Sequence, residues 1–270
     1  MAFLDNITIG QFIPQESIVH QLDPRAKILL ILIPVIFAAL TINLLIYCFL
    51  LVFLLSLFFL SKLPVSFLFR NLKTFAWLFV LVFILQVIFT SAFFETVYYL
   101  GFFHLSAEAF FNGLTYSLRL VVFILGAVVL SLTTSPVDLT DGLVKSFLWL
   151  KKLKFPVQEL GLIAMISLRF VPLLVEEAAN LRKAQLSRGA SFQGNLFQRI
   201  RKTLPLLIPL FVSSFRKADE LALALDARGF RSGQDRSSFK QFQFKMVDYL
   251  FLCLTLILTI MCLLIKRSGW

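Results

Sequence analysis

Two arginine-glycine pairs are the residues of this chain whose type and spacing most clearly predict a chemical role. They stand in Ser187-Arg188-Gly189 and in Ala227-Arg228-Gly229, so the two arginines are 40 positions apart. A guanidinium carries five hydrogen-bond donors and stays charged, so it suits a carboxylate or carbonyl partner. The two pairs therefore predict two binding tips for an acidic or carbonyl-rich surface.

Either pair alone also has a purely structural explanation. Glycine just past a helix end tolerates the left-handed backbone conformation, and a cation in the last turn meets the negative end of the helix dipole. The occurrence of two such pairs within one basic region favours docking over two unrelated helix ends.

Two long amphipathic segments, at about 155–189 and 204–229, must position these arginines. In each segment apolar residues recur every three or four positions, which is typical of one face of an α-helix. The stripes are Ile163, Ile166, Phe170, Leu174, Ala178, Leu181 and Ala184, and then Ile208, Phe211, Phe215, Ala218, Ala222 and Leu225. Each arginine continues its stripe, so we expect both at helix ends, in phase with the buried face.

Other reactive residues give weaker signals. Asp138 and Asp141 could form a metal pair, but helix capping explains them better. His104 has no cysteine, carboxylate or second histidine at ligand spacing. Gly189 and Gly194 have the spacing of a phosphate-binding loop, yet Asn-Leu follows where Lys-Ser/Thr is required. We therefore expect no catalytic residue, no metal site and no cofactor or ATP bound by this chain itself.

The composition indicates an integral membrane protein. Hydrophobic residues make up 59% of the 270, against about 45–50% in soluble domains. The net charge of +11 lies within residues 145–245, which hold 18 of the 26 Lys and Arg but only 7 of the 15 Asp and Glu. Such a block indicates a cytoplasmic face, anionic lipid or an acidic partner. Nucleic acid is disfavoured, because no aromatic stacking platform accompanies the charge.

Charge-free stretches predict an all-α polytopic membrane protein with about five transmembrane helices and long cytoplasmic amphipathic helices. The expected spans are about 24–40, 44–60, 74–94, 109–132 and 247–265. By role, the chain divides into 1–132 (four spans), 133–245 (cytoplasmic helices) and 246–270 (last span and tail). Arg119 lies inside the fourth span, where it either snorkels or meets a carbonyl group.

Several segments, taken together and in this order, resemble the transmembrane (T) component of energy-coupling-factor transporters, a branch of the prokaryotic ATP-binding-cassette importers. They are Leu22-Asp23-Pro24-Arg25, Thr133-Thr134-Ser135-Pro136 with Asp138-Leu139-Thr140, Leu168-Arg169-Phe170-Val171-Pro172, Ala184-Gln185-Leu186-Ser187-Arg188-Gly189, and Ala224-Leu225-Asp226-Ala227-Arg228-Gly229-Phe230.

The resemblance implies a coupling subunit that is not itself an enzyme. In that family two Ala-Arg-Gly motifs insert their arginines into grooves of two ATPase subunits, which bind ATP and Mg. Cytoplasmic coupling helices and the membrane part hold a separate substrate-binding S component for vitamin or micronutrient uptake. The matching positions here are Ser187-Arg188-Gly189, with serine in place of alanine, and Ala227-Arg228-Gly229.

The implied location is the prokaryotic cell membrane, with the N-terminus and the coupling helices in the cytoplasm. Two alternatives of other classes remain at this point. The first is a secondary carrier with its own substrate site, and the second, less favoured, is a membrane-embedded lipid enzyme.

Overall fold

A computed structural model describes residues 13–91, 98–100, 103–105, 107–192, 195–231 and 243–267 of the chain. These residues divide into two compact units. We call the described residues within 13–143 and 243–267 the span unit, and the described residues within 144–231 the arm unit. The predicted division by role, at 132/133 and 245/246, stays a prediction.

The all-α membrane fold is confirmed. The span unit contains α1 (Pro24–Leu40), α2 (Leu44–Leu60), α3 (Val65–Ser91), α4 (Ala107–Thr133), most of α5 (Pro136–Ser146) and α8 (Met246–Arg267). A small antiparallel pair, β1 (Tyr98–Leu100) and β2 (Phe103–Leu105), joins α3 to α4. It is too short to alter the helical class.

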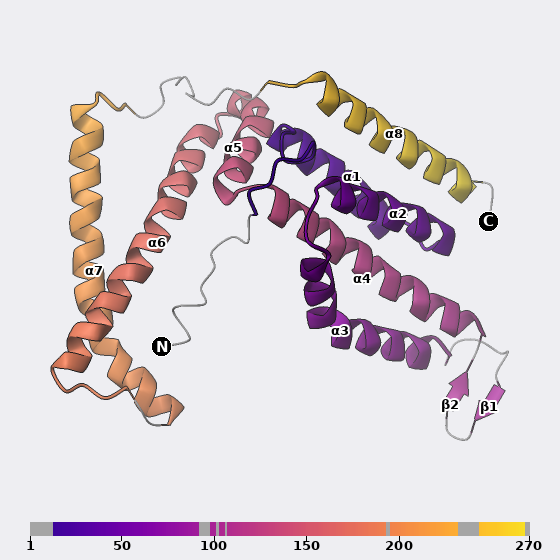
Figure 1. The fold of residues 1–270 in the computed structure, drawn as a ribbon, viewed down its shortest axis with the longest axis horizontal. Helices are drawn as coiled ribbons and strands as arrows, with labels where there is room; N and C mark the ends of the chain where they lie inside the picture. The colour runs from indigo at the N-terminus through magenta and orange to yellow at the C-terminus, as the bar shows by residue number, and fades with distance from the viewer. Residues whose placement is uncertain are drawn as a thin grey trace. The chain divides into compact units, whose positions relative to one another are not determined.

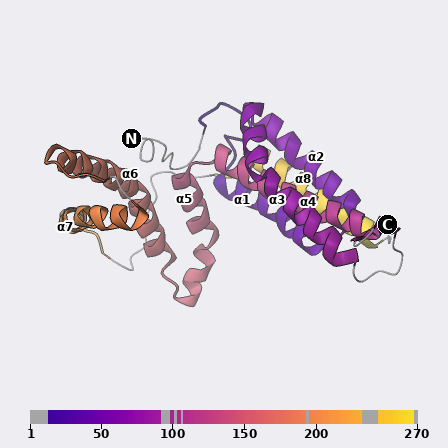
Figure 2. The ribbon, with the colours of Figure 1, turned by 90° about the horizontal axis from the view of Figure 1, so that it is seen from below.

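Helix α4 is central to the span unit. It packs against α1, α2 and α3, and α8 packs against α1. Figures 1 and 2 both show α4 running alongside these helices. The buried apolar side chains at these contacts include Leu30, Tyr47, Leu50, Leu54, Phe58, Val122, Leu125 and Val129.

Three of the described helices are long and apolar enough to cross a membrane, namely Val65–Phe89, Ala109–Thr133 and Met246–Lys266. Helices α1 and α2 have 17 residues each, or about 26 Å at 1.5 Å per residue, slightly less than a hydrocarbon core of roughly 30 Å. The count of five spans therefore stays a prediction.

The expected spans at about 44–60 and 74–94 left residues 61–73 as a charged connection, and this expectation is wrong over most of its length. Helix α3 begins at Val65 and carries Arg70 and Lys73 as exposed residues in its first turns. The prediction failed because it took these cations as marking a loop, whereas a helix that emerges from the bilayer can carry them.

Helix α1 has the bounds of the first expected span, about 24–40. Asp23 is the N-cap, Pro24 is the first helical residue, and the Arg25 amide donates to Asp23 Oδ1 over 2.9 Å. The buried carboxylate of Asp248, in the first turn of α8, accepts from the amides of Asp23 (2.9 Å) and Lys245 (2.7 Å). One carboxylate thus joins the starts of two helices that lie far apart in the sequence.

The structure decides between the two expectations for Arg119. Its Nη2 donates to the Thr41 carbonyl over 2.6 Å, and its Nε donates to Tyr47 Oη over 2.8 Å. Tyr47 Oη in turn donates to the Ala38 carbonyl over 2.7 Å. Arg119 therefore satisfies backbone groups that the break between α1 and α2 leaves without a helical partner.

The arm unit contains the 3₁₀ turn η1 (Leu148–Leu153), α6 (Val157–Ser187) and α7 (Leu196–Ala227). The first amphipathic segment, predicted at about 155–189, agrees with α6. The second helix begins at Leu196 and not at about 204, so the predicted connection at 190–203 is too long. Residues 196–203 are mostly polar or basic, and the apolar period that marked the helix starts only after them.

Candidate functional site: two arginine tips

The first arginine tip is a closed helix end. Arg188 is the C-cap of α6, and Gly189 follows with φ +84°. The Ala190 amide donates to the Gln185 carbonyl and the Gly189 amide donates to the Leu186 carbonyl, both over 3.0 Å. This pair of bonds is a Schellman motif, which satisfies the last carbonyls of the helix.

The second tip repeats this geometry at the end of α7. Arg228 is the C-cap and Gly229 has φ +73°. The Phe230 amide donates to the Leu225 carbonyl over 3.0 Å, and the Gly229 amide donates to the Asp226 carbonyl over 2.9 Å. The structural explanation of the two glycines is therefore correct for the backbone, and it leaves the two arginine side chains to be accounted for.

Both arginine side chains are exposed, as are Ser187, Gly189, Ala227 and Gly229. Among the described residues, neither guanidinium makes an ion pair or a side-chain hydrogen bond. The backbone thus holds each arginine at a fixed helix end while its five donors face outward. Such an end can bind a carboxylate or a set of carbonyl groups on another molecule.

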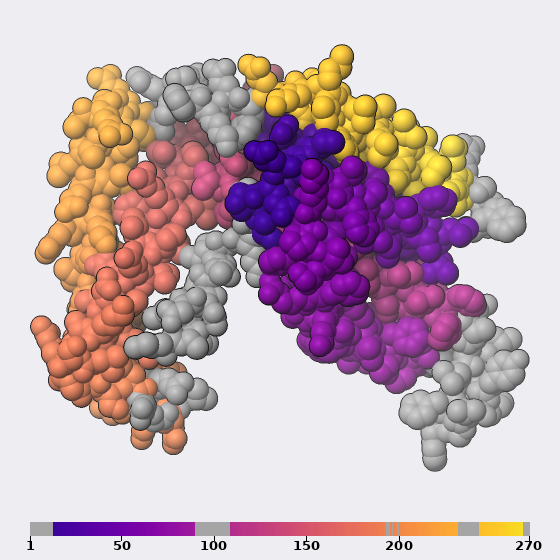
Figure 3. Space-filling view, viewed as in Figure 1, coloured from indigo at the N-terminus to yellow at the C-terminus, as the bar shows by residue number. Residues whose placement is uncertain are grey.

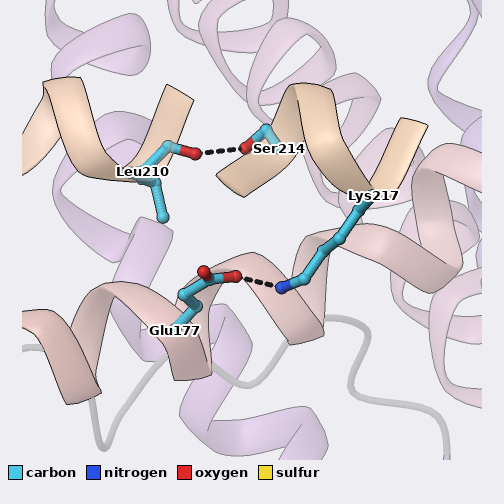
Figure 4. A network of polar contacts seen from close by, with 4 residues as sticks. All are labelled: Glu177, Leu210, Ser214 and Lys217. Carbon is cyan, nitrogen blue, oxygen red and sulfur yellow. Dashed lines mark hydrogen bonds and ion pairs between the residues drawn. The ribbon is translucent and has the colours of Figure 1, made fainter. Parts of the chain in front are cut away.

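Helices α6 and α7 contact each other where they cross (Figure 1), and they form the salmon and orange surface in Figure 3. We call this pair of consecutive helices the α6–α7 hairpin. An ion pair between Glu177 of α6 and Lys217 of α7 crosses the hairpin (Figure 4). Hydrogen bonds from Lys217 and then Ser213 hold the pKa of Glu177 below its usual value. Nearby, Ser214 Oγ donates to the Leu210 carbonyl over 2.7 Å.

Sequence reasoning missed this pair, although a signal for it was present. Glu177 and Lys217 are 40 positions apart, as are Arg188 and Arg228. An offset of 40 positions along the sequence therefore aligns the two arginines and also aligns the two ion-pair partners.

The apolar stripe of α7 is exposed, although its helical spacing predicted a buried face. Ile208 is 70% exposed, Phe211 61% and Phe215 69%. The residues of α7 that are half-buried lie on another side, and include Ser213, Ser214, Lys217 and Leu221. Within this chain, the large apolar side chains of the stripe are available to a further surface.

A basic hollow lies beside the first tip. Its volume is about 680 Å³, and it is lined by Ala190, Ser191, Phe192, Gln198, Arg201, Lys202 and Pro205. The guanidinium of Arg182 lies 5.6 Å from the centre of the Phe192 ring. The phosphate-loop glycine Gly194 falls outside the described residues.

The two aspartates that were weighed as a metal pair, Asp138 and Asp141, both lie in α5. The Asp138 amide donates to Ser135 Oγ over 3.1 Å, and Asp138 lies in the first turn of α5. This contact is the capping arrangement that the sequence indicated.

The model of one protein family, described as "CbiQ: Cobalt transport protein", matches residues 15–239. Three relatives are each named "Energy-coupling factor transporter transmembrane protein EcfT". The one from Lactococcus lactis is 38% identical over 267 residues, covering 98% of this chain and 100% of the relative. The one from Clostridium kluyveri is 36% identical over 268 residues, covering 99% of each. The one from Bacillus subtilis is 36% identical over 239 residues, covering 88% and 90%.

Proposed function

Because this chain belongs to the CbiQ family and is a transmembrane (T) component of an energy-coupling factor transporter, we propose that it couples two ATPase subunits to a separate substrate-binding S component. The transported substrate is a vitamin or another micronutrient. ATP and Mg bind in the ATPase subunits, and ATP hydrolysis takes place there.

One observation supports this proposal most directly. Two helices of one hairpin end in the same Schellman geometry, and each presents an exposed arginine. Two equivalent subunits, or two related ones, would each offer a groove to one of these ends. A carboxylate in each groove would pair with the guanidinium through parallel hydrogen bonds.

The hairpin is suited to transmit movement between these partners. When the two ATPase subunits close on ATP, their grooves approach each other and shift the ends of α6 and α7. The Glu177–Lys217 pair lies across the two helices and couples their displacement. The exposed apolar stripe of α7, with Phe211 and Phe215, would bear on the S component and tilt or release it.

The chain is embedded in a membrane, and we propose the prokaryotic plasma membrane with the N-terminus and the coupling helices in the cytoplasm. The basic block at residues 145–245 supports this orientation, because Lys and Arg are enriched in cytoplasmic segments.

Replacement of the two arginines tests the docking role. We expect Arg188→Ala or Arg228→Ala to weaken association with the ATPase subunits by roughly 2–5 kcal/mol each, because an unpaired carboxylate would remain in the groove. The double variant should neither co-purify with the ATPase subunits nor support substrate uptake in membrane vesicles.

Arg216→Ala is the matched control, since Arg216 is an exposed arginine of α7 away from both tips. It should co-purify and transport like the unaltered chain. Normal assembly and uptake by the double variant would contradict the proposal. Binding of the transported substrate by the purified chain alone would instead favour the secondary carrier.

A further inference from the structure

The basic hollow continues the surface of the first tip. Ala190 and Ser191, which line it, directly follow Gly189 of the docking motif. Arg201 and Lys202, from the second turn of α7, are exposed and also line it. A partner that covers Arg188 therefore also meets the rim of this hollow.

The two tips differ strongly in charge. Residues 178–198, centred on Arg188, include three Lys and Arg and no Asp or Glu. Residues 218–238, centred on Arg228, include three Lys and Arg and four Asp and Glu. The backbone geometry of the tips is the same, so charge is what distinguishes them.

The lining of the hollow suits a carboxylate. Arg201 offers a planar fork of donors and Lys202 offers a compact positive charge. Gln198 and Ser191 add neutral hydrogen-bonding groups, and Phe192 adds an apolar wall on which Arg182 rests. A side chain of Asp or Glu that enters here would meet both positive charge and neutral hydrogen-bond donors.

We propose that this hollow is a second binding site for the ATPase subunit at the first tip, and that it takes an acidic segment of that subunit. This inference rests on the proposed function and extends it, because it makes the first tip a two-point contact and the second tip a one-point contact. The charge difference steers the more acidic ATPase surface to Arg188.

Association kinetics test the hollow separately from the arginine tips. The full-length chain is immobilised in nanodiscs, and the two ATPase subunits, produced without it, are passed over it at about 50 mM and about 500 mM salt. We expect the double variant Arg201→Gln with Lys202→Gln to associate roughly tenfold more slowly at low salt. The difference should shrink at high salt, because screening removes long-range attraction.

The matched control is Lys73→Gln with Lys152→Gln, which removes the same charge from two exposed lysines outside the tip. It should associate at the rate of the unaltered chain. Equal thermal unfolding midpoints of both double variants would show that the hollow variant is folded.

The outcomes separate this inference from the proposed function. If Arg188→Ala with Arg228→Ala abolishes association while the hollow variant matches its control, the hollow inference alone is overturned. If neither pair of replacements alters association, both proposals are overturned. Weaker binding of the hollow variant to phosphatidylglycerol vesicles, with unchanged ATPase association, would assign the hollow to lipid and also overturn the inference.

Discussion

Gly189 and Gly229 are required for backbone conformation and not for space. A Cβ at either position would meet no atom within 4 Å, yet φ is +84° and +73°. A residue with a side chain is strained in this region by about 1–2 kcal/mol, and asparagine tolerates it better than most. The direction in which each arginine leaves its helix therefore depends on the residue that follows it.

We predict that Gly229→Ala weakens docking of the second tip more than Gly229→Asn does. Alanine should move the backbone out of the left-handed region and displace Arg228, whereas asparagine should keep the turn. Co-purification with the ATPase subunits and the thermal unfolding midpoint would measure this. Equal effects of the two replacements would show that conformation at this position does not control the tip.

At the scale of elements, the α6–α7 hairpin has a charged contact whose strength depends on pH. Hydrogen bonds from Lys217 and Ser213 lower the pKa of Glu177, so the folded state binds a proton less readily than the unfolded chain. The stabilisation is therefore complete above the ordinary glutamate pKa and is lost as the pH falls through the lowered one. Because both side chains are partly exposed, the pair contributes at most about 1 kcal/mol.

We predict that Glu177→Gln lowers the thermal unfolding midpoint slightly at pH 7 and that the difference disappears in acid, below the lowered pKa of Glu177. The exchanged pair, Glu177→Lys with Lys217→Glu, should recover most of the loss. Thermal unfolding of the purified chain as a function of pH would test this. A difference that stays constant with pH would mean that the ion pair is not its source.

The sequence predicted the elements whose signals are local. The Asp23-Pro24 start of α1, the end of α6 at Ser187 and both arginine tips follow from capping and apolar spacing. Errors arose where charge was read as a boundary, at Arg70 and Lys73 of α3 and at the basic start of α7. Contacts such as Glu177 with Lys217 depend on how two helices face each other, which no single helix specifies.

At the scale of the whole chain, hydrogen bonds between residues far apart in sequence hold the helices of the span unit together. Besides the contact of Arg119 with Thr41, Lys266 Nζ of α8 donates to the Leu40 carbonyl over 3.3 Å. Two cations from later helices therefore lie at the carbonyl end of α1, where the helix dipole favours positive charge.

We predict that Arg119→Met destabilises the span unit by roughly 1.5–3 kcal/mol, because the Thr41 carbonyl loses a charged donor in an apolar environment. Arg119→Lys should retain part of this stability with one of the two bonds. The thermal unfolding midpoint in detergent would measure both variants, with Arg169→Met, an exposed arginine of α6, as the control. An Arg119→Met chain as stable as the control would refute the capping role.

The bonds of Asp248 and Lys266 to the two ends of α1 also bear on biosynthesis. The groups that complete α1 belong to α8, more than 220 residues later in the chain. During translation, the first helix thus enters the bilayer before the ribosome has made its last partners. A chain that is cut short before α8 would insert into the membrane without the groups that complete α1. Cellular quality control should remove such a chain, so only complete copies of the subunit would accumulate.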